Sequence, residues 1–203
     1  GDRIAVGVSG GKDSYTLLHI LDQLRRRAPI EYELVAVNVD SGFPGYRTET
    51  IANHLAEHGF EHRMEPTNCY EIIEDKRRPG TSYCSFCARL RRGVLYTLAD
   101  KLDCNKIALG HHLDDFIETL LLNQFYTGSL KAMSPKLQAD NGRHTVIRPL
   151  VYVEEGDIIR FSREQSFPIV CCACPVCGIA DQKRQRMKSL VRELARENKH
   201  LKK

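Results

Sequence analysis

The chain has 203 residues, of which 42% are hydrophobic, and its formal net charge is +4. This size and composition suit one α/β domain with a modest appendage. No apolar run approaches the roughly 20 residues that a membrane helix needs. No signal peptide is visible, so we expect a cytoplasmic protein with no membrane partner.

Apolar runs and helical patterns alternate along the chain. We expect strands at 4–8, 32–39, 61–65, 106–109 and 144–148, and helices at 47–58, 86–101, 113–125, 154–165 and near the C-terminus. A further helix is expected soon after the first strand, with Leu17, Leu18, Leu21 and Leu24 as the apolar stripe on one side. Residues 66–82 and 127–146 are predicted as loops. Repeated β–α units predict an α/β fold with a doubly wound, mainly parallel sheet and flanking helices, which binds ligands at the carboxyl ends of its strands. Residues 1–165 would form the main α/β domain, and 166–203 would complete its ligand site.

A glycine-rich turn follows the first predicted strand and precedes the first helix. It runs through Val8, Ser9, Gly10, Gly11, Lys12, Asp13 and Ser14. In such a turn, backbone N–H groups and a helix N-terminus point toward one place and attract phosphate. The glycines allow close approach, the lysine adds a charge, and the serines add donors. The turn therefore predicts a phosphate site; the alternative is a connection that binds nothing.

This turn is not an ordinary P-loop, because Val6 stands where that pattern needs glycine and Asp13 where it needs serine or threonine. The run S-G-G-K-D-S instead resembles the PP-loop of the ATP pyrophosphatase superfamily. The resemblance implies that ATP is cleaved between its α- and β-phosphates and that a substrate is adenylated. The nucleotide contacts that we expect are Val8, Ser9, Gly10, Gly11, Lys12, Asp13, Ser14, Asp40, Gly110 and His111.

An acidic helix is predicted directly after Gly110. Asp114 and Glu118 share one helix face, and we expect the buried face to consist of Ile117, Leu120 and Leu121. Carboxylates beside a phosphate site suit Mg²⁺, although stabilisation by the helix dipole explains Glu118 equally well. The pattern G-H-x-x-D-D-x-x-E-T also resembles a motif of PP-loop enzymes. The expected catalytic residues are Lys12, Asp13, Asp114 and Asp115.

Eight cysteines without a secretory signal indicate metal or redox chemistry rather than disulfides. Six of them gather in two regions, as the C-x-x-C pairs Cys84–Cys87 and Cys174–Cys177 with Cys171 and Cys172 beside the second pair. Two such pairs suit a structural zinc site or an iron–sulfur cluster, and their spacing alone slightly favours zinc. Cys69 and Cys104 are predicted as buried small side chains.

A longer set of motifs covers essentially the whole chain. C-S-F-C-A-R-L-R-R-G from Cys84, I-R-P-L from Ile147 and F-P-I from Phe167, which leads to C-x-x-C-G, resemble motifs of the tRNA 2-thiocytidine synthetase family. The resemblance implies a [4Fe–4S] cluster held by three cysteines, with one iron left open for sulfur. Cys84 and Cys87 would be two ligands, and Cys174 or Cys177 the third. The cysteine-rich run V-C-C-A before the second pair departs from the family pattern.

Positive charge gathers in three places. Residues 181–203 hold nine lysines and arginines against three acidic residues, and further clusters occupy 76–78 and 89–92. Nucleic acid is one expected partner; the alternative for the tail is a solvated amphipathic helix that buries Leu190, Leu194 and Leu201.

The family resemblance implies ATP-dependent tRNA thiolation, in which the C2 oxygen of a cytidine, at position 32 of the anticodon loop, is adenylated and replaced by sulfur. ATP, Mg²⁺ and the [4Fe–4S] cluster would be required, with cysteine desulfurase or free sulfide as sulfur donor and a homodimer as an open possibility. The alternatives are a tRNA 2-thiouridine synthetase of the same superfamily and a non-catalytic zinc-containing RNA-binding module.

Overall fold

The centre of the molecule is a six-stranded sheet with the strand order β3-β2-β1-β4-β6-β5. The structure, a computed structural model, describes residues 1–78, 82–139, 142–174, 182–198 and 200–202. Neighbouring strands are parallel except β5, which pairs antiparallel with β6 at one edge. This confirms the predicted doubly wound, mainly parallel sheet. The strands are β1 (Asp2–Gly7), β2 (Tyr32–Asp40), β3 (His62–Pro66), β4 (Lys106–Ala108), β5 (Lys136–Gln138) and β6 (Thr145–Ile147).

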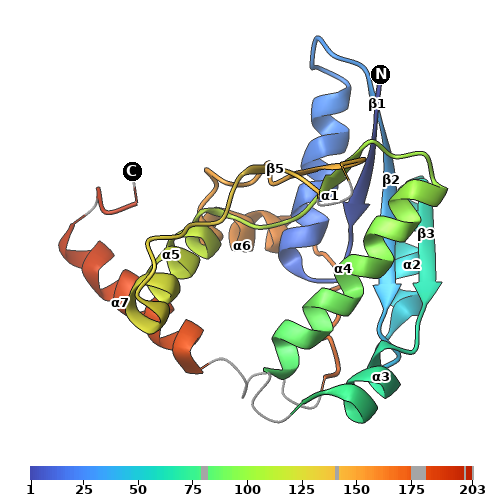
Figure 1. The fold of residues 1–203 in the computed structure, drawn as a ribbon. Helices are drawn as coiled ribbons and strands as arrows, with labels where there is room; N and C mark the ends of the chain where they lie inside the picture. The colour runs from blue at the N-terminus through green and yellow to red at the C-terminus, as the bar shows by residue number, and fades with distance from the viewer. Residues whose placement is uncertain (79–81, 140–141, 175–181, 199, 203) are drawn as a thin grey trace.

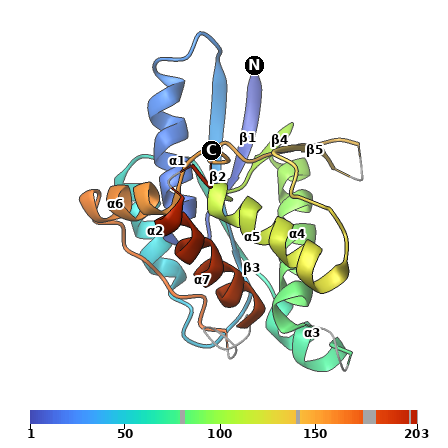
Figure 2. The same cartoon turned by 90° about the vertical axis from the view of Figure 1, so that its left-hand side faces the viewer.

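Helices cover both faces of this sheet (Figure 1). One face packs against α1 (Lys12–Arg25), α2 (Thr48–Glu57) and α6 (Glu155–Glu164), and the other against α4 (Tyr83–Lys101). The short α3 (Cys69–Lys76) contacts α4. Beside the sheet, α5 (Leu113–Thr127) and α7 (Gln182–Glu197) pack against each other, as Figure 2 shows.

The alternation of side chains along β1 explains why a separate hydrophobic core lies on each face of the sheet. Ile4 and Val6 are buried in the core under α1, whereas Ala5 is buried in the core under α4. Successive strand residues point to opposite faces, and a strand covered on both faces is apolar throughout. The continuous apolar run at the start of the chain therefore places β1 in the middle of the sheet.

Three predicted elements differ from the structure. Residues 66–82, predicted as a loop, contain α3, and the predicted loop 127–146 contains β5. The third difference is that α4 begins at Tyr83, three residues before the predicted start, so Cys84 and Cys87 both lie on this helix. The predicted core stripe of α1 is confirmed except for Leu24, which is exposed.

The predicted apolar faces of α5 and α7 are wrong in detail. On α5, Asp114 and Glu118 are buried, whereas the expected face of Ile117, Leu120 and Leu121 is only half-buried. Basic groups from the C-terminal region cover the two acids, which removes them from water. On α7, Met187 and Val191 are buried, while Leu190 is half-buried and Leu194 is exposed. Leu201 lies beyond the end of α7 and is also exposed.

Within the described residues, no helix combines the length and apolar character required to cross a membrane.

Candidate active site

The predicted phosphate turn connects β1 to α1. Gly10 has a φ of +79°, a left-handed conformation that favours glycine. A Cβ atom there would lie 2.8 Å from Ile51 Cδ1 and 3.0 Å from Val170 Cβ, so no side chain fits. At Gly11, a Cβ atom would meet only Ser9 Oγ, at 3.6 Å. The backbone at Gly11 is therefore open to a ligand.

Hydrogen bonds from other segments hold the turn in place. Asn38, which is fully buried in β2, donates Nδ2 to the Val8 carbonyl oxygen at 2.7 Å and to the Tyr46 hydroxyl at 2.9 Å. That hydroxyl donates to the Ser9 carbonyl oxygen at 3.1 Å. The backbone N–H of Val170 donates to the carbonyl oxygen of Gly10 at 2.9 Å. The sequence analysis gave Asn38 and Tyr46 no function, although a polar Asn38 within an apolar strand was a usable signal.

The end of β4 touches the turn directly. A Cβ atom at Gly110 would lie 2.9 Å from the Asp13 carbonyl oxygen and 3.2 Å from the Ser14 backbone nitrogen. Gly110, two residues beyond the end of β4, therefore lies directly against the phosphate turn. Asp40, another expected nucleotide contact, has a different role from Gly110. Its Oδ1 accepts a hydrogen bond from the Gly42 N–H at 2.8 Å and so closes the turn after β2.

A cavity of about 370 Å³, which we call the nucleotide cavity, lies beside the turn. This volume is within the range of small-molecule sites. Among the expected nucleotide contacts, its lining includes Val8, Ser9, Asp13, Ser14, Gly110 and His111. Asp115 also lines it, while α4 adds Arg91 and Arg92. Arg91 and Arg92 were expected to contact nucleic acid, but both also reach the nucleotide cavity. Gly10, Gly11, Lys12, Asp40 and Asp114 are not part of this lining.

Lys12 is held by two acids. Its Nζ lies 2.8 Å from Asp13 Oδ1 and 3.3 Å from Glu155 Oε1. Burial opposes the charge on Lys12, but the two carboxylates outweigh it and raise the lysine pKa. Glu155 also pairs with Lys188 of α7 at 2.6 Å. Lys12 is therefore a fixed cation behind the turn, linked through Glu155 to the C-terminal helix.

A buried histidine lies between two of the expected catalytic carboxylates. His112 Nε2 is 3.7 Å from Asp13 Oδ1 and 3.5 Å from Asp115 Oδ2. The backbone N–H of His112 also donates to Asp115 Oδ2 at 3.1 Å, which fixes this carboxylate at the start of α5. Asp13 and Asp115 are thus brought together at the nucleotide cavity.

Asp114 has different partners from Asp115. Its Oδ2 accepts a hydrogen bond from the Glu155 N–H at 2.7 Å, and its Oδ1 accepts one from Lys202 Nζ at 2.6 Å. Burial would raise the Asp114 pKa, but Lys202 and the amide outweigh it and lower the pKa. On the next turn of α5, burial raises the pKa of Glu118, while Arg184, whose Nε is 3.7 Å from Glu118 Oε2, opposes this shift. These two acids connect α5 to the C-terminal region.

His111 lines the nucleotide cavity in its neutral form. Burial, reinforced by nearby arginines and opposed by Asp115, lowers its pKa to about 4. Arg148 Nε donates to His111 Nδ1 at 3.2 Å, which requires an unprotonated Nδ1. The I-R-P-L motif therefore contributes an arginine that orients His111.

Cys84 and Cys87 lie in the first turns of α4, three residues apart and therefore on one face of the helix. Cys84 is exposed and Cys87 is half-buried. Burial raises the Cys87 pKa, while Arg91 and a hydrogen bond with Ser41 oppose this shift. The predicted burial of Cys69 and Cys104 is confirmed, with 2% and 4% exposure.

Two described cysteines of the second cysteine region have identifiable neighbours. Cys174 interacts electrostatically with the Tyr83 hydroxyl, and Tyr83 precedes Cys84 at the start of α4. Cys172 lines a cavity of about 210 Å³ together with Phe43 and Tyr46. This cavity and the nucleotide cavity share Ser9, Val39 and Arg91 as lining residues. Cys177 lies outside the described residues.

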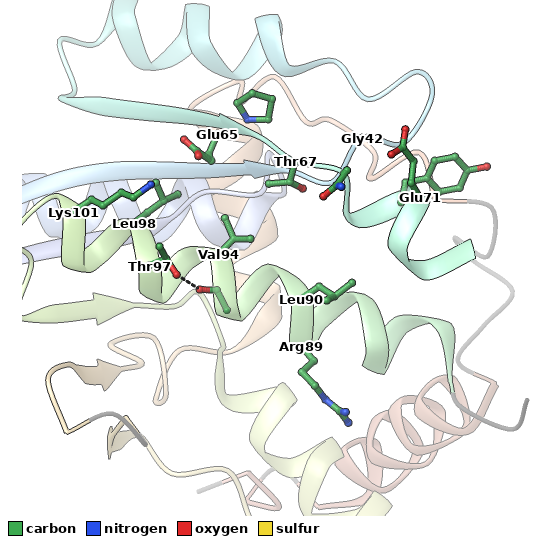
Figure 3. A pocket seen from close by; sticks show the side chains of 14 residues that line it. Gly42, Glu65, Thr67, Glu71, Arg89, Leu90, Val94, Thr97, Leu98 and Lys101 are labelled. Atoms are coloured by element: carbon green, nitrogen blue, oxygen red, sulfur yellow. Dashed lines mark hydrogen bonds between the residues drawn. The ribbon is translucent and has the colours of Figure 1, made fainter. Parts of the chain in front are cut away.

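A larger cavity, of about 840 Å³, lies between β3, α3 and α4 (Figure 3). Its walls carry Glu65 and Glu71 on one side and Arg89 and Lys101 on the other. None of the residues that line it belongs to the phosphate turn. Arg89 therefore belongs to a different surface from Arg91 and Arg92.

The family model of the PP-loop domain matches residues 1–170. The tRNA-cytidine(32) 2-sulfurtransferase of Geobacter sulfurreducens is 71% identical over 198 residues, which are 98% of this chain and 77% of that protein. The enzyme of the same name from Geotalea uraniireducens is 67% identical over 203 residues, or 100% of this chain and 81% of that protein.

The chain belongs to the tRNA-cytidine(32) 2-sulfurtransferase family. Among solved structures, it is similar to the U34-tRNA thiolase NcsA from Methanococcus maripaludis with its [4Fe-4S] cluster. The TM-score is 0.80 at 22% identity, over 100% of this chain and 68% of that one. This similarity confirms the fold. The expected family and its ATP pyrophosphatase type of enzyme are confirmed by the closely related sequences and the domain match.

Proposed function

We propose that the protein thiolates a tRNA cytidine at C2, at position 32 as in the named relatives. The observation that carries this proposal is the contact between the nucleotide cavity and the cavity that contains Cys172, across Ser9, Val39 and Arg91. A base bound at this junction would lie between the ATP phosphates and the cavity that Cys172 of the cysteine-rich segment lines. Adenylation and sulfur transfer can then follow each other without release of the base.

The first step is an in-line substitution at the α-phosphorus of ATP. The C2 oxygen of cytidine forms a bond to this phosphorus, and the bond to the bridging oxygen breaks, which releases pyrophosphate. The open backbone at Gly11 and the N-terminus of α1 would stabilise the phosphate charge. Lys12 would add positive charge behind the turn, and Arg91 and Arg92 would add it from α4. In the second step, sulfide forms a bond to C2 and AMP leaves, so no net oxidation or reduction occurs.

Asp13 and Asp115 fit the proposed Mg²⁺ site better than Asp114 does. Both line the nucleotide cavity and approach the same nitrogen, Nε2 of His112, at 3.7 and 3.5 Å, whereas Asp114 Oδ2 lies 3.8 Å from the other ring nitrogen, Nδ1. Hard oxygen ligands shared with substrate phosphates are typical of Mg²⁺. We assign Asp114 to positioning instead, because its two oxygens are occupied by Lys202 and the Glu155 amide.

The cysteines that the structure describes suit an iron–sulfur cluster. Among the described residues, no three cysteine sulfurs lie within 4.8 Å of one another. Thiolates on a single zinc ion would be about 3.8 Å apart, whereas those of a cluster bind different irons. Cys84 and Cys87, in the first turns of α4, would hold the cluster together with a third cysteine, for which we favour Cys174 over Cys177. When bound, the cluster supplies sulfur to C2.

The C-terminal segment 166–203 would complete this site and contact the tRNA. The exposed basic side chains of α7 are Lys183, Arg186, Arg192 and Arg196. They can neutralise phosphates of the RNA backbone, while Lys188 and Lys202 hold the segment against Glu155 and Asp114. A cysteine desulfurase or free sulfide would supply the sulfur in the cytoplasm. A homodimer stays a prediction.

A thiolation assay tests the proposal. The anaerobically purified protein is incubated with tRNA, ATP, Mg²⁺ and sulfide, and the tRNA is then digested to nucleosides. We expect 2-thiocytidine, formed only when ATP is present, together with iron and sulfide in the protein. Thiolated uridine would favour the 2-thiouridine alternative. A colourless protein with zinc, no sulfide and no thiolated product would favour the RNA-binding module.

A further inference from the structure

A cluster of three histidines lies between α1 and α2, outside the nucleotide and cysteine cavities. His19 comes from α1, His54 from α2, and His58 directly follows α2. One ring nitrogen from each histidine can be chosen so that all three lie within 4.8 Å of one another. Within the described part of the chain, no other set of at least three histidine, cysteine or acidic side chains meets this criterion.

We propose that His19, His54 and His58 bind one divalent transition-metal ion, for which Zn²⁺ is the representative. Imidazole nitrogen suits this class of metals, and three protein ligands leave a fourth position for water. The site is separate from the proposed thiolation chemistry, and the proposal does not rest on that chemistry.

The orientation of the rings supports a metal site. His19 Nε2 and His54 Nε2 are 3.0 Å apart. Two nitrogens on a tetrahedral zinc ion are about 3.3 Å apart, so a small ring movement would place a metal between them. His58 Nδ1 is 2.9 Å from the His54 carbonyl oxygen. Because a carbonyl can only accept, Nδ1 carries the proton, and Nε2 of His58 keeps its lone pair for a metal.

The surroundings favour neutral rings. Tyr15 and Phe167 pack against His54, and Phe60 and Phe167 pack against His19. Such an apolar shell excludes water and holds ligand rings in place. Burial, together with the neighbouring histidines, also lowers the His19 pKa to about 4, although Asp22 opposes this shift. The neutral ring is the form that binds a metal.

Because the cluster lies between α1 and α2, a bound metal would link these two helices. α1 begins at the phosphate turn, and Ile51 of α2 packs against Gly10, one helical turn before His54. A metal bound to both helices would fix them relative to each other behind the turn. Bound metal should therefore raise the stability of the folded protein, provided that the assembled cluster binds it more tightly than the unfolded chain does.

Zinc counting tests the proposal, with His58→Gln as the main variant because His58 is exposed and its replacement should not prevent folding. His62→Gln is the matched control: His62 Nδ1 also lies 2.9 Å from a carbonyl oxygen, that of Phe60, but His62 is outside the cluster. Full-length wild type and both variants are dialysed against Zn²⁺ at a buffered free concentration, and bound zinc is measured per chain. All three proteins have the same cysteines, so any zinc that binds to cysteine adds the same amount to each measurement.

Wild type and His62→Gln should bind one more zinc ion per chain than His58→Gln. Zinc should also raise the Tm of the first two proteins more than that of the third, and His54→Gln should behave as His58→Gln does. Circular dichroism without metal checks that every variant is folded. Equal zinc content in wild type and folded His58→Gln would overturn the proposal.

Discussion

The α-carbon of Gly110 approaches the Asp13 carbonyl oxygen so closely that a Cβ atom at position 110 would lie only 2.9 Å from this oxygen. This contact joins the end of β4 to the phosphate turn. The neighbour is backbone rather than a flexible side chain, so it cannot move aside without shifting the turn. The two halves of the proposed ATP site therefore depend on one glycine.

Gly110→Ala should weaken ATP use. Overpacking of this kind costs about 1–3 kcal/mol, so we expect the KM for ATP to rise about 5- to 150-fold. The measurement is pyrophosphate release at varied ATP concentration. Gly93→Ala is the control, because a Cβ atom there has nothing within 4 Å and alanine is the better helix former. A normal KM in Gly110→Ala would contradict the importance of this contact.

Tyr46→Phe should loosen the turn without changing its volume. The variant loses the hydroxyl that accepts from Asn38 and donates to the Ser9 carbonyl oxygen. An unsatisfied buried group costs about 1–3 kcal/mol, so we expect lower unfolding free energy and a higher KM for ATP. Denaturant unfolding and pyrophosphate release measure the two effects. Tyr152→Phe, at an exposed tyrosine, should change neither. Unchanged values in Tyr46→Phe would count against the hydrogen bonds that hold the turn.

Adjacent acids on α5 should respond differently to loss of charge. Asp115→Asn should lower the rate of pyrophosphate release at least about 100-fold and weaken its dependence on Mg²⁺, because Asp115 lines the nucleotide cavity. Asp114→Asn should mainly lower stability, because Asp114 holds Lys202 and the Glu155 amide. Magnesium titrations and thermal unfolding separate the two outcomes. A Mg²⁺ defect confined to Asp114→Asn would reverse our assignment.

Replacement of single cysteines by serine should identify the third cluster ligand. Cys84→Ser, Cys87→Ser and Cys174→Ser should each lose most of the bound iron and the visible absorption of the cluster. Cys104→Ser is the control, since Cys104 is buried in the core under α4. Cys172→Ser should keep its iron but affect thiolation, because Cys172 lines the adjoining cavity. If Cys174→Ser retained its iron and Cys177→Ser lost it, Cys177 rather than Cys174 would be the third cluster ligand.

His111 should make stability depend on pH. The pKa of His111 is lowered to about 4 in the folded protein, below the 6.5 of a free histidine. Between these values the unfolded chain binds a proton that the folded chain does not, so stability falls as pH decreases from about 6.5 to 4. His111→Gln should reduce this decrease by up to about 1.4 kcal/mol per pH unit. Urea unfolding at several pH values measures it, with His200→Gln as an exposed control. A decrease of equal slope in wild type and His111→Gln would contradict the prediction.

Much of the site could be predicted from local sequence. The turn from Ser9 to Ser14 has a characteristic order of glycines, lysine and acid between an apolar strand and a helix. The order of its residues determines where backbone N–H groups point, so the phosphate site needs no distant contact. The cysteine pairs are equally local, because C-x-x-C places two sulfurs on one side of a helix turn. The β–α alternation predicted the sheet for the same reason.

Distances between remote segments could not be predicted in this way. Sequence spacing groups Asp114 with Asp115, but the fold places one against Lys202 and the other at the nucleotide cavity. Arg91 and Arg92 were expected to contact RNA, yet α4 packs so that both line the nucleotide cavity together with residues of the turn. The histidine cluster brings together His19 and His54 from two different helices, so no local sequence pattern predicts it.

Local residue order was enough to predict the fold class, the family, the phosphate turn and the cysteine pairs, because each is carried by short motifs of neighbouring residues. Three features depend on the packed fold instead: which acids face the nucleotide cavity, how this cavity meets the second one, and why the acidic face of α5 is buried. Those features arise from helix packing, which places side chains from separate segments within a few ångströms of one another and decides which charges find partners away from water.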